Sequence, residues 1–94
     1  MRIPQVTGIE TAIEIYYSTI EMKNADIRQL FGKISSSTIA KLKNVARAKM
    51  REKDVPTWNA NYVNTAAAFE AWGLNIEDLE RRAAKLSKLK RQMR

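Results

Sequence analysis

The side chains that could do chemistry in this sequence are hydroxyls, amides, carboxylates and cationic groups, because its 94 residues include no histidine and no cysteine. The three serines at 35–37 lack the histidine, or the lysine at a known hydrolase spacing, that would activate a nucleophile. Glu77, Asp78 and Glu80 cluster at a predicted helix start, where helix electrostatics accounts for them. The absence of histidine and cysteine also excludes thiol chemistry and most kinds of zinc site. We therefore expect a binding protein that is not an enzyme, with no cofactor and no metal site.

The formal net charge of +7 is unevenly distributed along the chain. Residues 23–53 hold nine basic and two acidic side chains, and residues 81–94 hold seven basic and no acidic ones. Residues 54–80 hold five acidic and no basic side chains. An excess of lysine and arginine attracts polyanions such as nucleic acid or an acidic membrane surface. The two basic blocks are therefore the candidate binding regions.

Length and composition favour one folded unit. Ninety-four residues suit a single domain over 1–94, and 45% hydrophobic residues with few Gly and Pro are typical of a globular helical chain. Apolar runs of at most four residues are too short to span a bilayer, and the N-terminus lacks the apolar core of a signal peptide. We expect a cytoplasmic protein without a membrane partner.

The first predicted helix begins after Thr7, a good N-cap with Glu10 at the spacing of a capping box. Apolar residues then recur at three- and four-residue steps and form one stripe. This stripe consists of Ile9, Ala12, Ile13, Tyr16, Tyr17 and Ile20.

Because no segment shows the alternation of a strand, we expect an all-α fold, a compact bundle of about five helices.

Two further helices follow in the first basic block. Asn24 is the predicted cap of a short helix that Gly32 ends in a left-handed conformation. Ser35 is the predicted cap of a longer helix that reaches Lys53, where Asp54, Val55 and Pro56 break it. The apolar positions with helical spacing in these two helices are Ile27, Leu30, Phe31, Ile39, Leu42, Val45, Ala46 and Met50.

The chain after residue 56 continues with an ordered loop or short turn and a fourth helix. Residues 57–63 have no clear period, although Trp58 and Tyr62 are large enough to anchor them. Asn64 caps a short helix that Gly73 closes. The aromatic side chains expected in the core rather than stacked on bases are Tyr16, Tyr17, Phe31, Trp58, Phe69 and Trp72.

The last predicted helix is basic and covers about 76–93. Asn75 and Asp78 have capping-box spacing at its start. The apolar residues at heptad a and d positions are Ile76, Leu79, Ala83, Leu86 and Met93, with Lys90 interrupting the pattern and Leu89 shifting it by one residue. The helix is a candidate homodimer seam, and the alternative is that it packs on its own domain, because the pattern lasts about two and a half heptads.

The segment from Ile27 to Lys43 resembles the helix-turn-helix of bacterial and phage transcription regulators. In that family an apolar residue lies four or five positions before the turn glycine, as do Ile27 and Gly32 here. A Ser-x-x-Thr-(Val/Ile)-x-x-apolar string opens the recognition helix, and the matching residues are Ser35, Thr38, Ile39 and Leu42. The resemblance covers about a quarter of the chain and implies a helix-turn-helix over about 24–53 that binds double-stranded DNA.

A helix that reads DNA buries one stripe and presents its first turns to the major groove. The outward side chains that could then reach base edges are Ser36, Ser37, Ala40, Lys41 and Asn44. Contacts with phosphates commonly supply most of the affinity. The residues expected to make them are Lys33, Ser35, Lys43 and Arg47. Backbone N–H groups at Asn24 and Ser35 would add phosphate contacts.

These features predict DNA binding without catalysis, as in a transcriptional regulator of a bacterium, phage or mobile element. One alternative is a DNA-recognition protein such as a phage terminase small subunit, whose DNA-binding part looks similar. Another is a protein-interaction module, in which residues 54–80 and the last helix dock a protein partner and the basic residues only form a solvated face. A dimer would recognise a two-fold repeat with half-sites roughly 34 Å apart.

Overall fold

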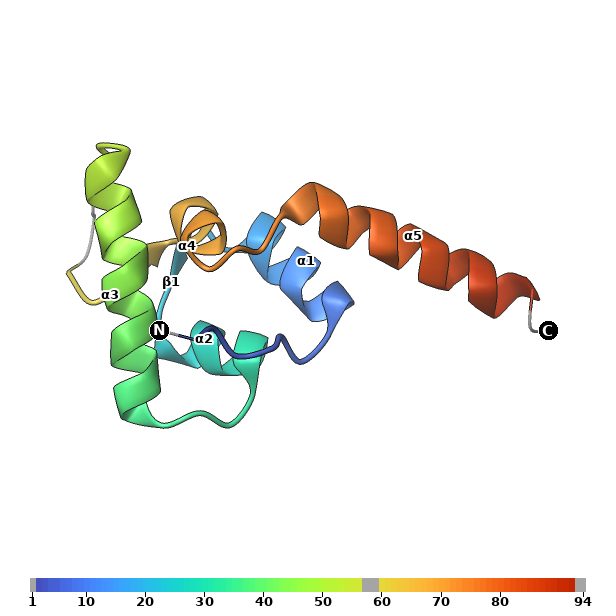
Figure 1. The fold of residues 1–94 in the computed structure, drawn as a ribbon, viewed down its shortest axis with the longest axis horizontal. Helices are drawn as coiled ribbons and strands as arrows, with labels where there is room; N and C mark the ends of the chain where they lie inside the picture. Colours follow the sequence, from blue (N-terminus) through green and yellow to red (C-terminus); the bar gives the residue numbers. More distant parts are fainter. Residues whose placement is uncertain (1, 57–59, 93–94) are drawn as a thin grey trace.

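The computed structural model describes residues 2–56 and 60–92, which fold into five helices and one two-stranded sheet (Figure 1). The helices are α1 (Ile9–Ser18), α2 (Asn24–Phe31), α3 (Ser36–Glu52), α4 (Thr65–Ala71) and α5 (Ile76–Gln92). The strands are β1 (Glu21–Met22) and β2 (Val63–Asn64). The predicted all-α class with about five helices is confirmed. Met93, the predicted end of the last helix, lies outside the described residues.

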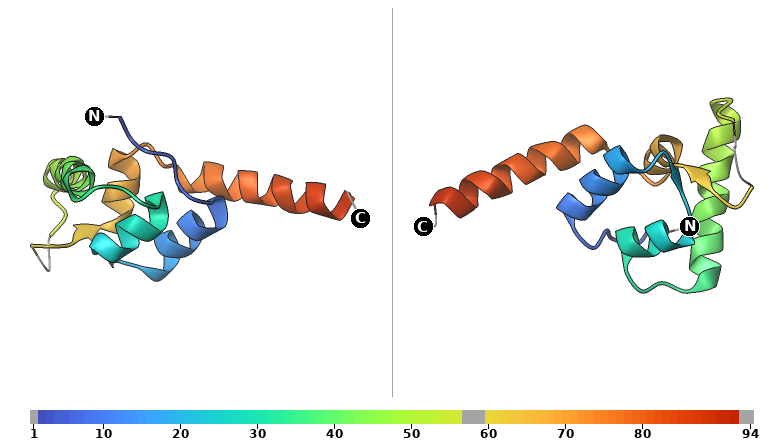
Figure 2. Two further views of the ribbon diagram at one scale, coloured as in Figure 1. Left: turned by 90° about the horizontal axis from the view of Figure 1, so that it is seen from below. Right: turned by 180° about the vertical axis from the view of Figure 1, so that it is seen from behind.

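The helices form a body from which α5 projects. α3 packs against α4, and α1 packs against α5. Figures 1 and 2 show the first turns of α5 lying along α1, while its later turns extend beyond the body at the end opposite α3. The longest dimension of the molecule is therefore 48 Å, against 27 and 22 Å for the other two.

No sequence signal indicates the small sheet. β1 and β2 pair antiparallel, with Glu21 opposite Asn64 and Met22 opposite Val63. Two residues are too few to display the alternation by which strands are recognised. Met22 and Val63 are fully buried, so the sheet joins the chain between α1 and α2 to the chain that enters α4.

The core is built by side chains from all five helices and both strands. The rings of Phe31 and Trp72 meet edge to face with centroids 5.3 Å apart, and the Trp72 indole N–H donates to the Leu42 carbonyl at 2.9 Å. This contact ties the end of α4 to the middle of α3. The buried apolar residues are Ala12, Ile15, Met22, Ile27, Leu30, Phe31, Ile39, Leu42, Ala46, Met50, Val63, Ala67, Ala68, Phe69, Trp72 and Leu79.

The apolar stripe predicted for α1 is partly wrong. Tyr17 and Ile20 are 65% and 80% exposed, and Ile15, which the predicted stripe omits, is buried. Because α1 ends at Ser18, helical spacing does not extend to Ile20. The Tyr17 hydroxyl donates to the carboxylate of Glu80 on α5, a contact that raises the pKa of Tyr17. Of the other expected core aromatics, Tyr16 is half-buried and Trp58 lies outside the described residues.

The prediction that Thr7 caps α1 is also wrong. Gly8 is the cap residue of α1, and it has no side chain to form a capping hydrogen bond. The hydroxyl of Thr7 donates instead to the Gln29 carbonyl at 2.9 Å, and its backbone N–H donates to the Leu30 carbonyl at 2.8 Å. Both carbonyls belong to the last turn of α2, where helical partners are missing. Thr7 therefore fastens the N-terminal segment to the end of α2.

Three other predicted caps are confirmed. The side-chain oxygens of Ser35, Asn64 and Asn75 each accept a hydrogen bond from the backbone N–H three residues later, at 3.1, 2.9 and 2.9 Å. These caps satisfy N–H groups that have no partner inside the helix. They fix where α3, α4 and α5 begin.

α3 and α4 end in the same hydrogen-bond pattern. The N–H of Val55 donates to the Met50 carbonyl, and the N–H of Leu74 donates to the Phe69 carbonyl, both at 2.8 Å. This Schellman arrangement requires a left-handed residue just before the donor. At the end of α4 that residue is Gly73, but at the end of α3 it is Asp54, with φ of +56°.

We predict that Asp54→Gly increases the free energy of unfolding by roughly 0.5–1 kcal/mol, because glycine adopts positive φ without strain. The substitution also removes a negative charge from a helix C-terminus, where it is unfavourable. The midpoint of urea unfolding measures the change. Gly73→Ala is the matched control and should lower stability by about 1 kcal/mol, since an added Cβ meets no atom within 4 Å and only the backbone is strained. Destabilisation by both substitutions would contradict this account.

Candidate nucleic-acid interface

A turn formed by residues 32–35 joins α2 to α3, and its path depends on Gly32. The Gly32 N–H donates to the Arg28 carbonyl at 2.7 Å, which completes the last turn of α2. Its φ and ψ of +84° and −151° lie in a region that is essentially restricted to glycine. A Cβ at this position would lie 3.1 Å from the Thr7 methyl group. The backbone conformation therefore requires glycine where α2 turns toward α3, and the nearby Thr7 methyl group would add crowding.

α3 is divided lengthwise into a buried stripe and an exposed face. Ile39, Leu42 and Ala46 are buried and Val45 is half-buried, as the spacing predicts. The outward residues of the first half of the helix are all exposed. We call them the α3 face, and they are Ser36, Ser37, Ala40, Lys41 and Asn44. Lys33 in the preceding turn is exposed as well.

The serine run forms the start of α3. The Ser35 hydroxyl accepts the capping hydrogen bond, and it also lies 3.2 Å from the Ser37 hydroxyl and 2.9 Å from the Thr38 hydroxyl. Ser36 lies 3.5 Å from the Arg28 guanidinium across the turn. No acidic residue occurs in this first turn. The helix N-terminus, which carries a partial positive charge, is therefore not neutralised by its own side chains.

Lys43 does not join the α3 face, because it is only 9% exposed. Lys43 follows Ile39 by four residues, so helical spacing places it on the buried stripe. The sequence therefore contains a signal for its burial. Its ammonium group donates to the Asn24 side-chain carbonyl at 3.0 Å. Burial lowers the pKa of Lys43, and the nearby charge of Arg47 lowers it further.

Asn24 is not the cap of α2, contrary to the sequence-based prediction. Lys23 precedes the helix as the cap residue, and its backbone N–H donates to the Asp26 carboxylate at 3.0 Å. Asn24 is the first residue inside the helix. Its side chain contacts Lys43 of α3 and thereby connects the start of α2 to the middle of α3.

Arg47 is half-buried and is also committed to a structural contact. Its guanidinium group donates to the Ala60 carbonyl at 2.7 Å. This hydrogen bond holds the chain that leads to β2 against α3. Of the four residues expected to contact phosphates, Lys33 and Ser35 are exposed beside the α3 face, whereas Lys43 and Arg47 are turned toward other parts of the protein.

The second basic region lies on α5, away from α3. Arg82 pairs with Asp78 at 3.1 Å, and Leu79 is the buried residue of this helix. The exposed basic residues of α5 are Arg81, Arg82, Lys85, Lys88, Lys90 and Arg91. Figures 1 and 2 show that the later turns of α5 and the α3 helix lie at opposite ends of the molecule. The two basic regions are therefore separate surfaces.

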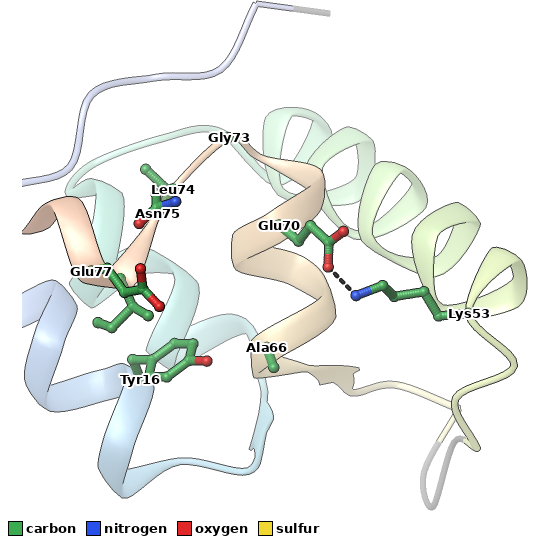
Figure 3. Close-up of a pocket in the computed structure, with 9 residues that line it drawn as sticks. Tyr16, Lys53, Ala66, Glu70, Gly73, Leu74, Asn75 and Glu77 are labelled. Atoms are coloured by element: carbon green, nitrogen blue, oxygen red, sulfur yellow. Dashed lines mark hydrogen bonds and ion pairs between the residues drawn. The ribbon is translucent and has the colours of Figure 1, made fainter.

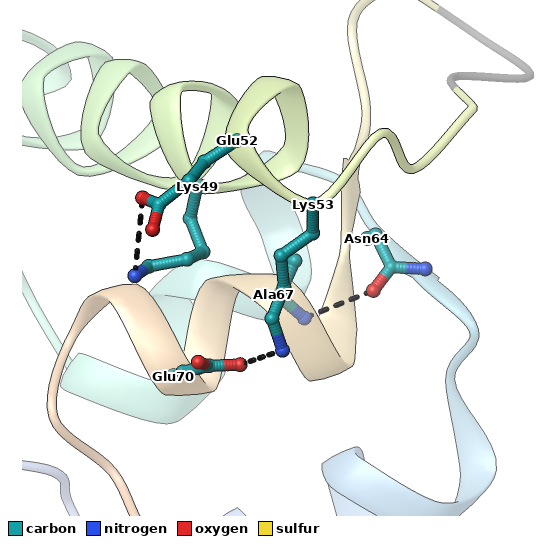
Figure 4. Close-up of polar contacts among 6 residues, drawn as sticks. All are labelled: Lys49, Glu52, Lys53, Asn64, Ala67 and Glu70. Carbon is teal, nitrogen blue, oxygen red and sulfur yellow. Dashed lines mark hydrogen bonds and ion pairs between the residues drawn. The ribbon is translucent and has the colours of Figure 1, made fainter.

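A cleft of about 620 Å³ lies between α1, α4 and the start of α5 (Figure 3). Tyr16, Glu70 and Glu77 line it, and Lys53 at the end of α3 pairs with Glu70 at its edge. The hydrogen bond from Lys53 lowers the pKa of Glu70. Figure 4 shows this pair beside the Lys49–Glu52 pair of α3. Two acidic side chains, Glu70 and Glu77, thus line a cleft that includes no residue of the α3 face.

The described residues give no support for a metal site or a membrane-spanning helix. Among residues 2–56 and 60–92, no three acidic side chains are grouped so that they could hold a metal ion. None of the described helices combines the length and apolar character needed to cross a membrane. Comparison with known protein families, curated proteins and solved structures yields no match. Function must therefore be inferred from the surfaces of this chain itself.

We predict that Gly32→Ala lowers the free energy of unfolding by roughly 2–3 kcal/mol, because alanine is strained in this backbone conformation and its methyl group crowds Thr7. Thermal and urea unfolding measure the loss. The double variant Gly32→Ala, Thr7→Ser removes the crowded methyl group and should recover only part of the stability. If Gly32→Ala costs no more than Gly73→Ala, the turn tolerates ordinary side chains.

Proposed function

We propose that this protein binds duplex DNA with the α3 face, as a helix-turn-helix regulator of bacterial, phage or mobile-element type that acts in the cytoplasm. α2, the turn at 32–35 and α3 follow one another as the elements of such a motif do. An α-helix is 10–12 Å wide with its side chains, which matches a major groove of about 12 Å. In this proposal the first turns of α3 enter the groove.

The observation that carries the proposal is the chemistry of the α3 face. Apart from the methyl group of Ala40, its side chains are two hydroxyls, one amide and one ammonium group, which can donate to or accept from base edges. No acidic residue occurs between Asp26 and Glu52, so no carboxylate of this segment would repel a phosphate. Lys33 stands at one end of the face and Lys41 within it, both exposed. They are the cations best placed to contact the DNA backbone.

We predict that Lys33→Gln combined with Lys41→Gln weakens binding to duplex DNA and makes it less dependent on salt. The plot of log affinity against log salt concentration has a negative slope, and each lost phosphate contact reduces its magnitude by about 0.9. The two substitutions should therefore reduce the magnitude of the slope by roughly two. Fluorescence anisotropy with a labelled duplex at several salt concentrations measures both quantities. Both lysines are exposed, so the folded structure should persist.

Lys85→Gln combined with Lys88→Gln is the matched control, because it removes the same charge from the other basic surface. If the two double variants weaken binding equally, net charge attracts the DNA and the α3 face does not direct it. A parent protein that fails to bind duplex DNA even at low salt would exclude the proposal. It would favour a protein-interaction module that uses the cleft lined by Glu70 and Glu77.

We also propose that two copies pair through the projecting part of α5. Leu86 and Leu89 are 46% and 54% exposed, and both belong to the second half of α5. In an antiparallel pair the two bodies lie at opposite ends of the joined helices, whereas a parallel pair would bring both bodies together at one end. We therefore expect an antiparallel pair.

We predict a dimeric mass for the parent protein and a monomeric mass for the variant Leu86→Ser, Leu89→Ser. Light scattering coupled to size-exclusion chromatography measures both masses at micromolar concentration. Ala84→Ser changes an exposed residue of the same helix and should leave the dimer intact. A monomeric parent protein would refute the pairing without affecting the proposed use of the α3 face.

A further inference from the structure

A second hollow lies between the start of α2, the middle of α3 and the chain that leads to β2. It has a volume of about 350 Å³. Its lining residues are Lys23, Asn24, Ala25, Lys43, Asn61 and Tyr62. Two of them are lysines, two carry side-chain amides and none is acidic. We call this hollow the lysine cleft.

The unusual feature of the lysine cleft is Lys43, a residue that is mostly buried although its side chain lines the hollow. A lysine that is 9% exposed normally requires a carboxylate partner, because an unpaired buried charge is costly. Within residues 2–56 and 60–92, Lys43 forms no ion pair. Its hydrogen bond at 3.0 Å goes to the neutral amide of Asn24 and uses one of three N–H donors. The positive charge is therefore left uncompensated.

Other positive groups surround the same place. Lys23 lines the cleft, and Arg47 is close enough to lower the pKa of Lys43. The carboxylate of Asp26 accepts a hydrogen bond from the Lys23 backbone at the cap of α2. The contact between Arg47 and Ala60 holds the chain just before the opposite wall, which Asn61 and Tyr62 form. The cleft is thus a hollow with excess positive charge.

We propose that the lysine cleft binds a phosphate group, with the ammonium groups of Lys43 and Lys23 donating to its oxygens. The proposal rests on the function proposed above, in which the phosphate is a phosphodiester of the DNA strand that borders the groove entered by α3. A phosphate anion supplies the negative charge that Lys43 lacks, and it accepts several hydrogen bonds at once. The same chemistry would accommodate a free phosphate monoester.

The first experiment uses the parent protein. A ¹H–¹⁵N NMR titration with inorganic phosphate, and a second with a short duplex, follow the amides of Asn24 and Ala25 and the side chain of Lys43. We expect saturable shifts at these groups with both ligands. Sodium chloride at matched ionic strength should produce no saturable shift. If chloride reproduces the phosphate shifts, general screening explains them and the site is overturned.

The two titrations separate this inference from the proposed function. Duplex binding without shifts at the lysine cleft would overturn the phosphate site and leave the α3 proposal standing. Saturable binding of phosphate without duplex binding would overturn the α3 proposal and assign the cleft to a free phosphate monoester. If neither ligand shifts the cleft residues, the phosphate site is overturned.

The second experiment removes the charge of Lys43. Lys43→Met keeps the length of the side chain and supplies an apolar group on the buried stripe, so the melting temperature should stay unchanged or rise. Affinity for the duplex should fall by about ten-fold or more as a charge-assisted contact is lost. Lys49→Met on the same helix, outside the cleft, is the matched control and should retain the affinity of the parent. A destabilised Lys43→Met protein with unchanged affinity would show that Lys43 is structural and would overturn the proposal.

Discussion

The packing of α3 against α4 and α2 determines where every residue of the candidate interface lies. The Trp72 indole bonded to the Leu42 carbonyl, together with the buried Ile39 and Ala46, fixes the rotation of α3 about its own axis. Once that stripe is buried, the side chains on the opposite side of the helix must face solvent. A rotation of α3 by one residue, about 100°, would bury Lys41 or Asn44 and expose part of the core. The α3 face is therefore a consequence of core packing.

Local signals along the chain predict much of this arrangement. Ser35, Asn64 and Asn75 act as caps because a short polar side chain before a helix can reach the third N–H whatever the tertiary structure. Gly32 and Gly73 end helices because positive φ is a local property of the backbone. These features need only a few neighbouring residues. Sequence reasoning therefore places all five helices.

The errors come from contacts between distant segments. Thr7 has the spacing of a cap, but carbonyls at the end of α2 compete for it. Tyr17 has the spacing of a core residue, but it contacts Glu80 on α5, 63 positions away. Lys43 has the helical spacing of a buried residue, but its positive charge favoured the prediction that it contacts phosphate. In the candidate site, sequence reasoning identifies the exposed α3 face and misses the lysine cleft, because Lys23, Lys43 and Asn61 meet only in the folded chain.

The projecting part of α5 has a geometric consequence for a two-fold pair. In an antiparallel pair, sliding one α5 along the other by a single helical turn moves the two bodies by about 5.4 Å. Because α3 lies at the far end of each body, the separation of the two α3 helices changes by nearly the same length. On DNA that length corresponds to between one and two base pairs, given a rise of about 3.4 Å per pair. In the proposed dimer, the register in which the α5 leucines pair would therefore set the spacing between the two bound half-sites.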